Sequence, residues 1–223
     1  VMGNVRFFLV SILLFTANPA DVQAKPGHPR VHAPVLKDLN VRYMLRGYCH
    51  ARTSIPDLHA AGGFGRSDNA ARALAERVSL PADSVVLHVV TDSQVPFADT
   101  YRGMRLLLIN NTAQPQRFSA SDSRLSIVQQ ALDPQGEWAD IEYLPQSWCG
   151  NSRHTVSLQP QEGWEFSAPR YVGTFLTRLR FRLDPGQGKP PIYSNEFAGS
   201  INLEQFSVQQ GHTPQGIMDP YNN

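Results

Sequence analysis

Cys149 and His154 are the two residues of this sequence whose types and spacing are best suited to chemistry. A thiol acts as a nucleophile when a nearby base favours its thiolate form, and an imidazole a few residues further along the chain can serve as that base. The pair therefore supports a cysteine-dependent enzyme. No cysteine-protease signature surrounds it, so we expect a protein without catalytic activity and keep the enzyme as the alternative.

The segment from Cys149 to Gln159 resembles the ligand loop of plant-type blue copper proteins, in which a cysteine, a histidine and a weakly bound glutamine are spaced as Cys149, His154 and Gln159 are here. The resemblance implies a cupredoxin-like redox protein, with His88 as the second imidazole ligand of the copper ion. Two features depart from that family. Strand patterns continue well beyond this loop, and Thr155 stands where the family has a further cysteine. We therefore expect no cofactor, and copper belongs to the alternative.

Cys149 has a competing partner in Cys49, the only other cysteine of the chain. In an oxidising compartment an even number of cysteines favours a disulfide, and a cross-link over a loop of this length stabilises a fold by about 4–5 kcal/mol on the chain-entropy argument. A bonded Cys149 neither ligates copper nor attacks a substrate. We predict a disulfide between Cys49 and Cys149, with two separate buried thiols as the alternative.

A row of arginines is the candidate ligand surface of this sequence. Arg178, Arg180 and Arg182 alternate with apolar residues, so they share the outer face of one strand. Together with Trp148, this row suits a protein or glycan ligand, and a sulfated or uronic glycan would supply the opposite charge. The row can instead be a solvated face, or it can pair with the acids of a neighbouring strand, and we favour these two interpretations over a ligand surface.

Asp140 and Glu142 are the acids that such a pairing would use. They lie two residues apart on the strand expected over residues 137–143, so we expect both on one face. Two neighbouring carboxyl groups are also what a glycosidase requires. Acids on the same face of a strand are more often solvated or paired with arginines, so the pairing is again the favoured interpretation.

The first 24 residues have the pattern of a secretory signal peptide. Arg6 precedes an apolar run over residues 7–15, and residues 22–24 suit cleavage after Ala24. The run is shorter than the roughly 20 residues that a membrane span needs. We therefore expect a periplasmic or extracellular protein, with no stable membrane anchor after cleavage.

The composition argues against several classes of partner. Lys and Arg number 20 against 19 Asp and Glu, a formal net charge of +1, which gives no electrostatic reason to bind nucleic acid. Hydrophobic residues make up 41% of the 223 residues, enough for one sizeable core. The 16 glycines and 17 prolines favour many turns and few long helices.

Alternation of apolar and polar residues predicts strands along most of the chain. An N-terminal extension over residues 25–83 is expected to hold one strand and a short helix, the helix from Asp68 to Val78. The core is expected over residues 84–207, followed by a flexible tail over residues 208–223.

The pattern from Ser84 to Phe206 resembles the immunoglobulin-like and fibronectin-type sandwiches of exported bacterial proteins. The resemblance implies an all-β fold, an antiparallel immunoglobulin-like β-sandwich with the short helix outside it. Within it, the turn Asp133–Gly136 predicts a hairpin between the flanking strands. Sandwiches host many functions, so the resemblance assigns none. We expect an exported, non-enzymatic protein that binds a protein or glycan partner at its surface.

Overall fold

The computed structural model describes residues 35–55, 64–74, 81, 83–145 and 150–211. They belong to the compact unit Pro34–Asn223. The expected signal peptide and most of the expected tail lie outside the described residues. Among the described residues, no helix has the length and apolar character needed to cross a membrane.

The first sheet has four antiparallel strands in the order β2-β10-β4-β3. Its members are β2 (Arg72–Ala73), β10 (Glu162–Pro169), β4 (Tyr101–Asn110) and β3 (Val85–Phe97). β3 and β4 form a long hairpin whose register shifts between Val90 and Val95. β4 is buried along most of its length because it lies between β3 and β10 and its inner face meets the second sheet.

The second sheet has seven strands, five of them in the order β12-β11-β6-β5-β9. These are β12 (Ile192–Tyr193), β11 (Phe175–Asp184), β6 (Arg124–Leu132), β5 (Gln116–Ser121) and β9 (Arg153–Leu158). β13 (Phe197–Ile201) also pairs with β11, and β7 (Trp138–Asp140) with β6. A separate parallel pair joins β1 (Leu45–Arg46) to β8 (Glu142–Tyr143). Two short 3-10 turns, η1 (Gly150–Ser152) and η2 (Leu203–Phe206), complete the elements.

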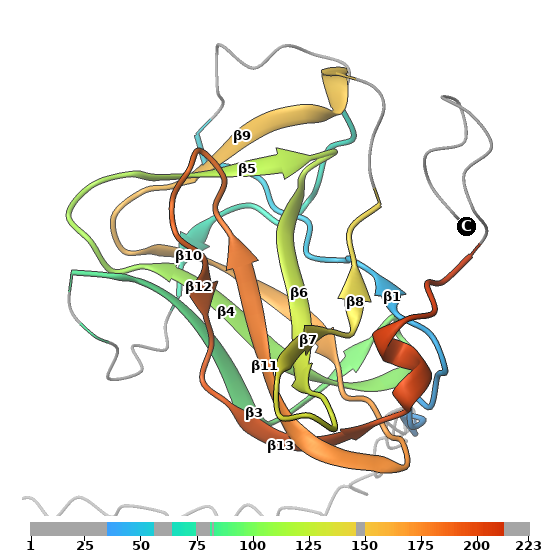
Figure 1. Cartoon of the computed structure of the whole chain (residues 1–223). Coiled ribbons are helices and arrows are strands. Elements are labelled where there is room, and N and C mark those ends of the chain that lie inside the picture. The colour runs from blue at the N-terminus through green and yellow to red at the C-terminus, as the bar shows by residue number, and fades with distance from the viewer. Residues whose placement is uncertain (1–34, 56–63, 75–80, 82, 146–149, 212–223) are drawn as a thin grey trace, which may run out of the picture. The chain divides into compact units, whose positions relative to one another are not determined.

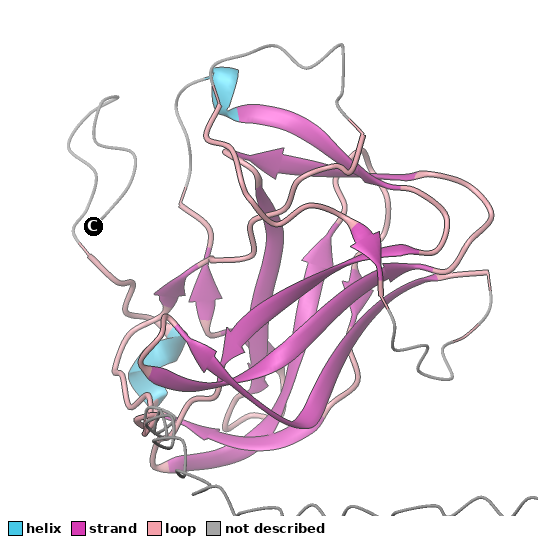
Figure 2. Cartoon of the chain, turned by 180° about the vertical axis from the view of Figure 1, so that it is seen from behind, coloured by secondary structure: helices cyan, strands magenta, loops and turns pink. Residues whose placement is uncertain are grey.

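The main core lies between the two sheets. Figures 1 and 2 show β6 and β11 on one side and β3, β4 and β10 crossing them on the other. Trp164 on β10 is 0% exposed, and its ring meets that of Phe118 on β5 edge to face at 5.7 Å. Its indole Nε1 donates to the carbonyl of Arg52 at 2.9 Å, so no polar atom of this large side chain is left unpaired. The all-β, antiparallel and sandwich-like prediction is confirmed at this level.

The helix predicted from Asp68 is wrong. Residues 72–73 form β2 on the edge of the first sheet, beside Glu162 and Gly163, and residues 75–80 lie outside the described residues. Buried Ala71 also donates its backbone N–H to the carbonyl of Arg52 at 2.8 Å. Residues 71–73 gain backbone hydrogen bonds from β10 and from Arg52. These bonds outweigh the weak helical preference of the segment.

Gly173, just before β11, lies close to the backbone at the end of β13. A Cβ atom at this position would collide with the backbone of Ile201 on β13. We predict that Gly173→Ala lowers the free energy of unfolding by about 3 kcal/mol, because the neighbour is backbone and cannot rotate away. Urea unfolding measures the effect, with Gly150→Ala as the control, since a Cβ at Gly150 meets no atom within 4 Å. Equal stabilities of the two variants would contradict the prediction.

Candidate functional site

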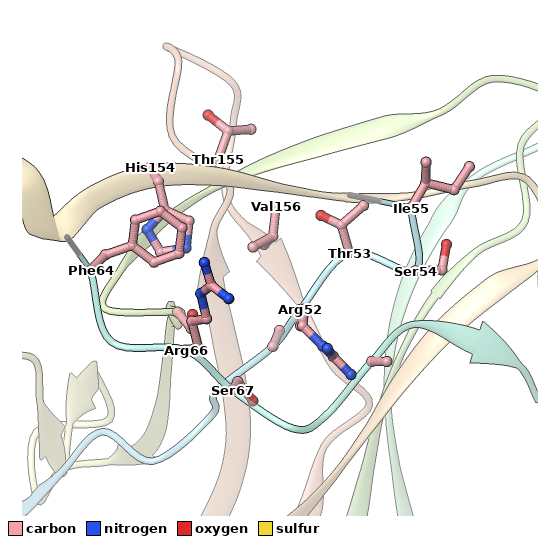
Figure 3. Close-up of a pocket in the computed structure, with 13 residues that line it drawn as sticks. Arg52, Thr53, Ser54, Ile55, Phe64, Arg66, Ser67, His154, Thr155 and Val156 are labelled. Carbon is pink, nitrogen blue, oxygen red and sulfur yellow. The ribbon is translucent and has the colours of Figure 1, made fainter. Parts of the chain in front are cut away.

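A pocket of about 350 Å³ opens between β9 and two irregular segments, residues 51–55 and 64–67. Figure 3 shows the side chains around it, with β9 crossing above the two segments. Its volume is at the lower end of the range for small-molecule sites.

The first of these segments is held firmly in the core. Ala51 is fully buried, and its N–H donates to the carbonyl of Ser123 at 2.7 Å. The next residue, Arg52, donates its N–H to Asn69 at 2.8 Å, while its carbonyl accepts from both Trp164 and Ala71. The backbone of Arg52 is thus fixed on both sides, so this lining residue has a rigid support. Figure 3 shows its side chain pointing away from that of Arg66, which extends toward the rings of Phe64 and His154.

Two guanidinium groups give the pocket a positive charge. Arg52 and Arg66 both line it and are both exposed. Among the residues that the structure describes, neither arginine forms an ion pair, and no carboxylate lines the pocket. Four other exposed arginines of the described chain pair with an acid, namely Arg42, Arg72, Arg102 and Arg178, whereas Arg117 and Arg153 form no ion pair with a described residue. The geometry therefore favours a negatively charged ligand.

His154 forms one wall of the pocket together with Phe64. The two rings stack with their centroids 3.8 Å apart and their planes within 13°. The ring atom Nδ1 lies 3.2 Å from the carbonyl oxygen of Ser152, so the neutral ring carries its proton there. Nε2 is then an acceptor, and it is buried without a partner among the described residues.

Hydroxyl groups complete the lining. Thr53 Oγ1 accepts the backbone N–H of Ser157 at 3.0 Å, and Ser67 Oγ accepts that of Asn69 at 3.1 Å. Since each oxygen already accepts, its own proton is available to a ligand in the pocket. Ile55 adds an apolar side chain that is 58% exposed. The pocket thus combines two charges of one sign, several hydroxyl donors and a small apolar surface.

The arginine row of β11 has a different environment. Arg182 pairs with Asp140 at 2.7 Å, and Arg178 pairs with Glu196. Arg180 lies between two aromatic rings, 4.1 Å from the centroid of Trp138 and 4.0 Å from that of Tyr193, and donates to the side chain of Gln130. Each member of the row therefore has a partner within the protein. Trp148, expected beside the row, lies outside the described residues.

Asp140 and Glu142 do not share one face, so that expectation is wrong. The strand is interrupted at Ile141, where the chain bends and enters the core. Asp140 ends β7 and faces Arg182 at the surface, whereas Glu142 in β8 is 1% exposed. Of the two acids, only Asp140 pairs with the arginine row at the surface.

The residues of the copper alternative lie on different sheets. His88 is in β3 of the first sheet and His154 in β9 of the second, while Gln159 follows β9 and donates its N–H to Glu162 at 2.9 Å. Cys149 lies outside the described residues, so the copper set and the Cys149–His154 nucleophile stay predictions. Within the part of the chain that the structure describes, no group of three or more His, Cys, Asp or Glu residues is placed to hold a metal ion.

Cys49 is a free thiol in the structure and is 1% exposed. Burial raises its pKa well above the usual value, and the nearby Glu142 carboxyl raises it further. Such a thiol is a poor nucleophile. The disulfide with Cys149 involves a residue outside the described ones and stays a prediction.

Arg52 and Arg66 are absent from our sequence-based candidates. Both lie in the glycine- and proline-containing stretch around residues 50–66, where no periodicity assigns a side chain to a face. The available signal was two arginines among serines and threonines in a loop-like segment. Comparison with known protein families, with curated proteins and with solved structures finds no match to this chain.

Proposed function

We propose that this protein is an exported, non-enzymatic binding protein that holds one acidic sugar unit of a glycan in the pocket of Arg52 and Arg66. The observation that carries the proposal is a pocket lined by two arginines that form no ion pair with a described residue, and by no described carboxylate. A guanidinium binds a carboxylate or sulfate through two parallel hydrogen bonds, and this geometry selects for such groups.

The remaining lining favours a sugar over a simple ion. The hydroxyls of Thr53 and Ser67 can donate to ring or hydroxyl oxygens, and Ile55 offers an apolar surface to the C–H face of a pyranose ring. At about 350 Å³ the pocket suits a single ring, with the rest of the glycan outside. A free inorganic anion would use the arginines alone.

Export and the finer fold assignment are parts of the same proposal. The signal-peptide pattern of residues 1–24 supports a periplasmic or extracellular location, where glycans are available as ligands. The two packed antiparallel sheets support an immunoglobulin-like arrangement. In sandwiches of this kind the loops at the sheet ends carry binding sites, and the pocket is built mainly from such irregular segments.

The proposal is tested by calorimetric titration of the protein with trigalacturonate, its methyl ester and sodium sulfate. We expect the acidic trisaccharide to bind at least about 10-fold more tightly than the ester, because hydrogen bonds to a charged group contribute about 1.5–3 kcal/mol. Sulfate is expected to compete weakly, and added salt to weaken binding. Equal affinities for acid and ester, or binding of sulfate alone, would contradict it.

A further inference from the structure

A second cleft, distinct from the arginine pocket, reaches into the interior of the sandwich. It has a volume of about 510 Å³ and opens beside the first residues of β11 and β13 and the start of β4. Most of its wall is apolar, with Met104, Leu179 and Phe197 among the lining residues. The side chains of Met104 and Leu179 are almost completely buried, so they form the inner part of the cleft.

Gln129 is the exception to this apolar wall. It lies on β6 in alternation with Leu125, Ile127 and Ala131, which are all buried, so its side chain faces the interior. It is 0% exposed and lines the cleft. Neither its amide oxygen nor its amide nitrogen has a hydrogen-bond partner among the described residues.

Such an amide is costly at this position. The large majority of buried polar side-chain atoms in proteins have a hydrogen-bond partner, and one without a partner loses its hydration without compensation. An apolar residue of similar length would fit the surrounding core without that cost. An unpaired donor and acceptor at the inner wall of an open cleft are therefore best explained by a ligand that pairs with both.

The charged groups around the cleft have partners in the protein. At its rim, Arg102 pairs with Asp38 at 2.8 Å, and Arg170 donates to the carbonyl of Thr91 at 2.7 Å. On the inner side, the hydroxyl of Tyr171 donates to Glu142 at 2.7 Å. The amide of Gln129 offers a hydrogen-bond donor and an acceptor side by side in the wall. Arg102 and Arg170, the charged groups at the rim, are already paired. This arrangement favours an uncharged ligand.

We infer that this cleft binds a small uncharged molecule of the carboxamide or lactam class, whose N–H and C=O pair with the amide of Gln129. The apolar body of the ligand lies against Met104, Leu179 and Phe197. This site does not depend on the proposed glycan pocket, because the two share no lining residue.

Benzamide and valerolactam are the probes for this site, and acetophenone, which has the carbonyl but no N–H, is their control. Ligand-detected NMR is expected to show saturable binding of both probes to the full chain, with acetophenone at least about 10-fold weaker. The Gln129→Met variant keeps the length and the apolar fit, so we expect it to melt at the same or a higher temperature and to bind the probes at least about 10-fold more weakly.

Three results would overturn the inference. The first is no saturable binding of either probe, and the second is equal affinity for wild type and Gln129→Met. The third is a crystal structure, grown with benzamide, in which an ordered water alone occupies both amide atoms. Because the arginine pocket is separate, Arg52→Gln is expected to leave benzamide binding unchanged, which distinguishes failure of this site from failure of the proposed glycan site.

Discussion

Replacing Glu142 with glutamine is expected to remove a loss of stability that the wild-type protein shows as the pH rises from 4.5 to about 7. Glu142 is buried in the core, and its carboxyl accepts hydrogen bonds from the hydroxyls of Tyr48 and Tyr171, at 3.0 and 2.7 Å, and from the backbone N–H of Gln129 at 2.9 Å. Burial raises its pKa from 4.5 to about 7, although these three donors act in the opposite direction.

The direction in which stability changes with pH follows from where Glu142 binds its proton more tightly. Because the folded state holds the proton of Glu142 more tightly than the unfolded state does, the stabilisation is complete below the unfolded pKa of 4.5 and is lost as the pH rises through the folded value of about 7. The shift corresponds to a loss of about 3 kcal/mol across that window. Titration of Tyr48, Cys49 and Tyr171 does not interfere, since burial raises each of these pKa values above the usual one.

Urea unfolding at a series of pH values measures this loss. Glu142→Gln carries a constant cost, because an amide oxygen replaces two acceptor oxygens, but the difference between wild type and variant should change by about 3 kcal/mol between pH 4.5 and about 7. The control is Glu204→Gln, at a partly exposed acid that pairs with Arg42, for which the difference should stay nearly constant. A constant difference for Glu142→Gln as well would show that this carboxyl does not titrate in the window.

The double variant Arg52→Gln/Arg66→Gln is expected to bind trigalacturonate at least about 100-fold more weakly than the wild type. Each guanidinium is assigned one charge-assisted contact with the ligand, and losing two such contacts costs about 3–6 kcal/mol. Neither arginine forms an ion pair among the described residues, so the stability of the fold should change little.

The matched control for this variant is Arg178→Gln/Arg182→Gln, which removes the same charge from the row on β11. Those arginines pair with Glu196 and Asp140, so we expect this variant to keep nearly the wild-type affinity. Equal weakening by the two double variants would mean that only net charge matters. Weakening by the β11 variant alone would place the ligand on the arginine row instead of in the pocket.

The strands with strict alternation were predictable from the sequence. Along β11, Leu179, Phe181 and Leu183 are buried while the arginines between them face outward, as a period of two requires. The turn before β7 is also as expected: Gly136 has a φ of +86° and its N–H bonds to Asp133, which joins β6 and β7 into a hairpin. In both cases the structure depends on residues that are close together in the sequence.

The errors arose where distant contacts decide the structure. Residues 72–73 become a strand because β10 offers an edge, and Glu142 enters the core because two tyrosines far along the chain bind its carboxyl. Arg52 and Arg66 line one pocket only because separate irregular segments lie beside β9. No periodicity in the sequence encodes such long-range contacts, so the pattern of alternation offered only the more regular arginines of β11 as a possible ligand surface.

A crystal structure of the protein with trigalacturonate tests the central claim most directly. The account predicts a sugar carboxylate within hydrogen-bond distance of the guanidinium groups of Arg52 and Arg66, with its ring against Ile55. A trisaccharide bound elsewhere on the surface, or an arginine pocket closed by other parts of the chain, would contradict it.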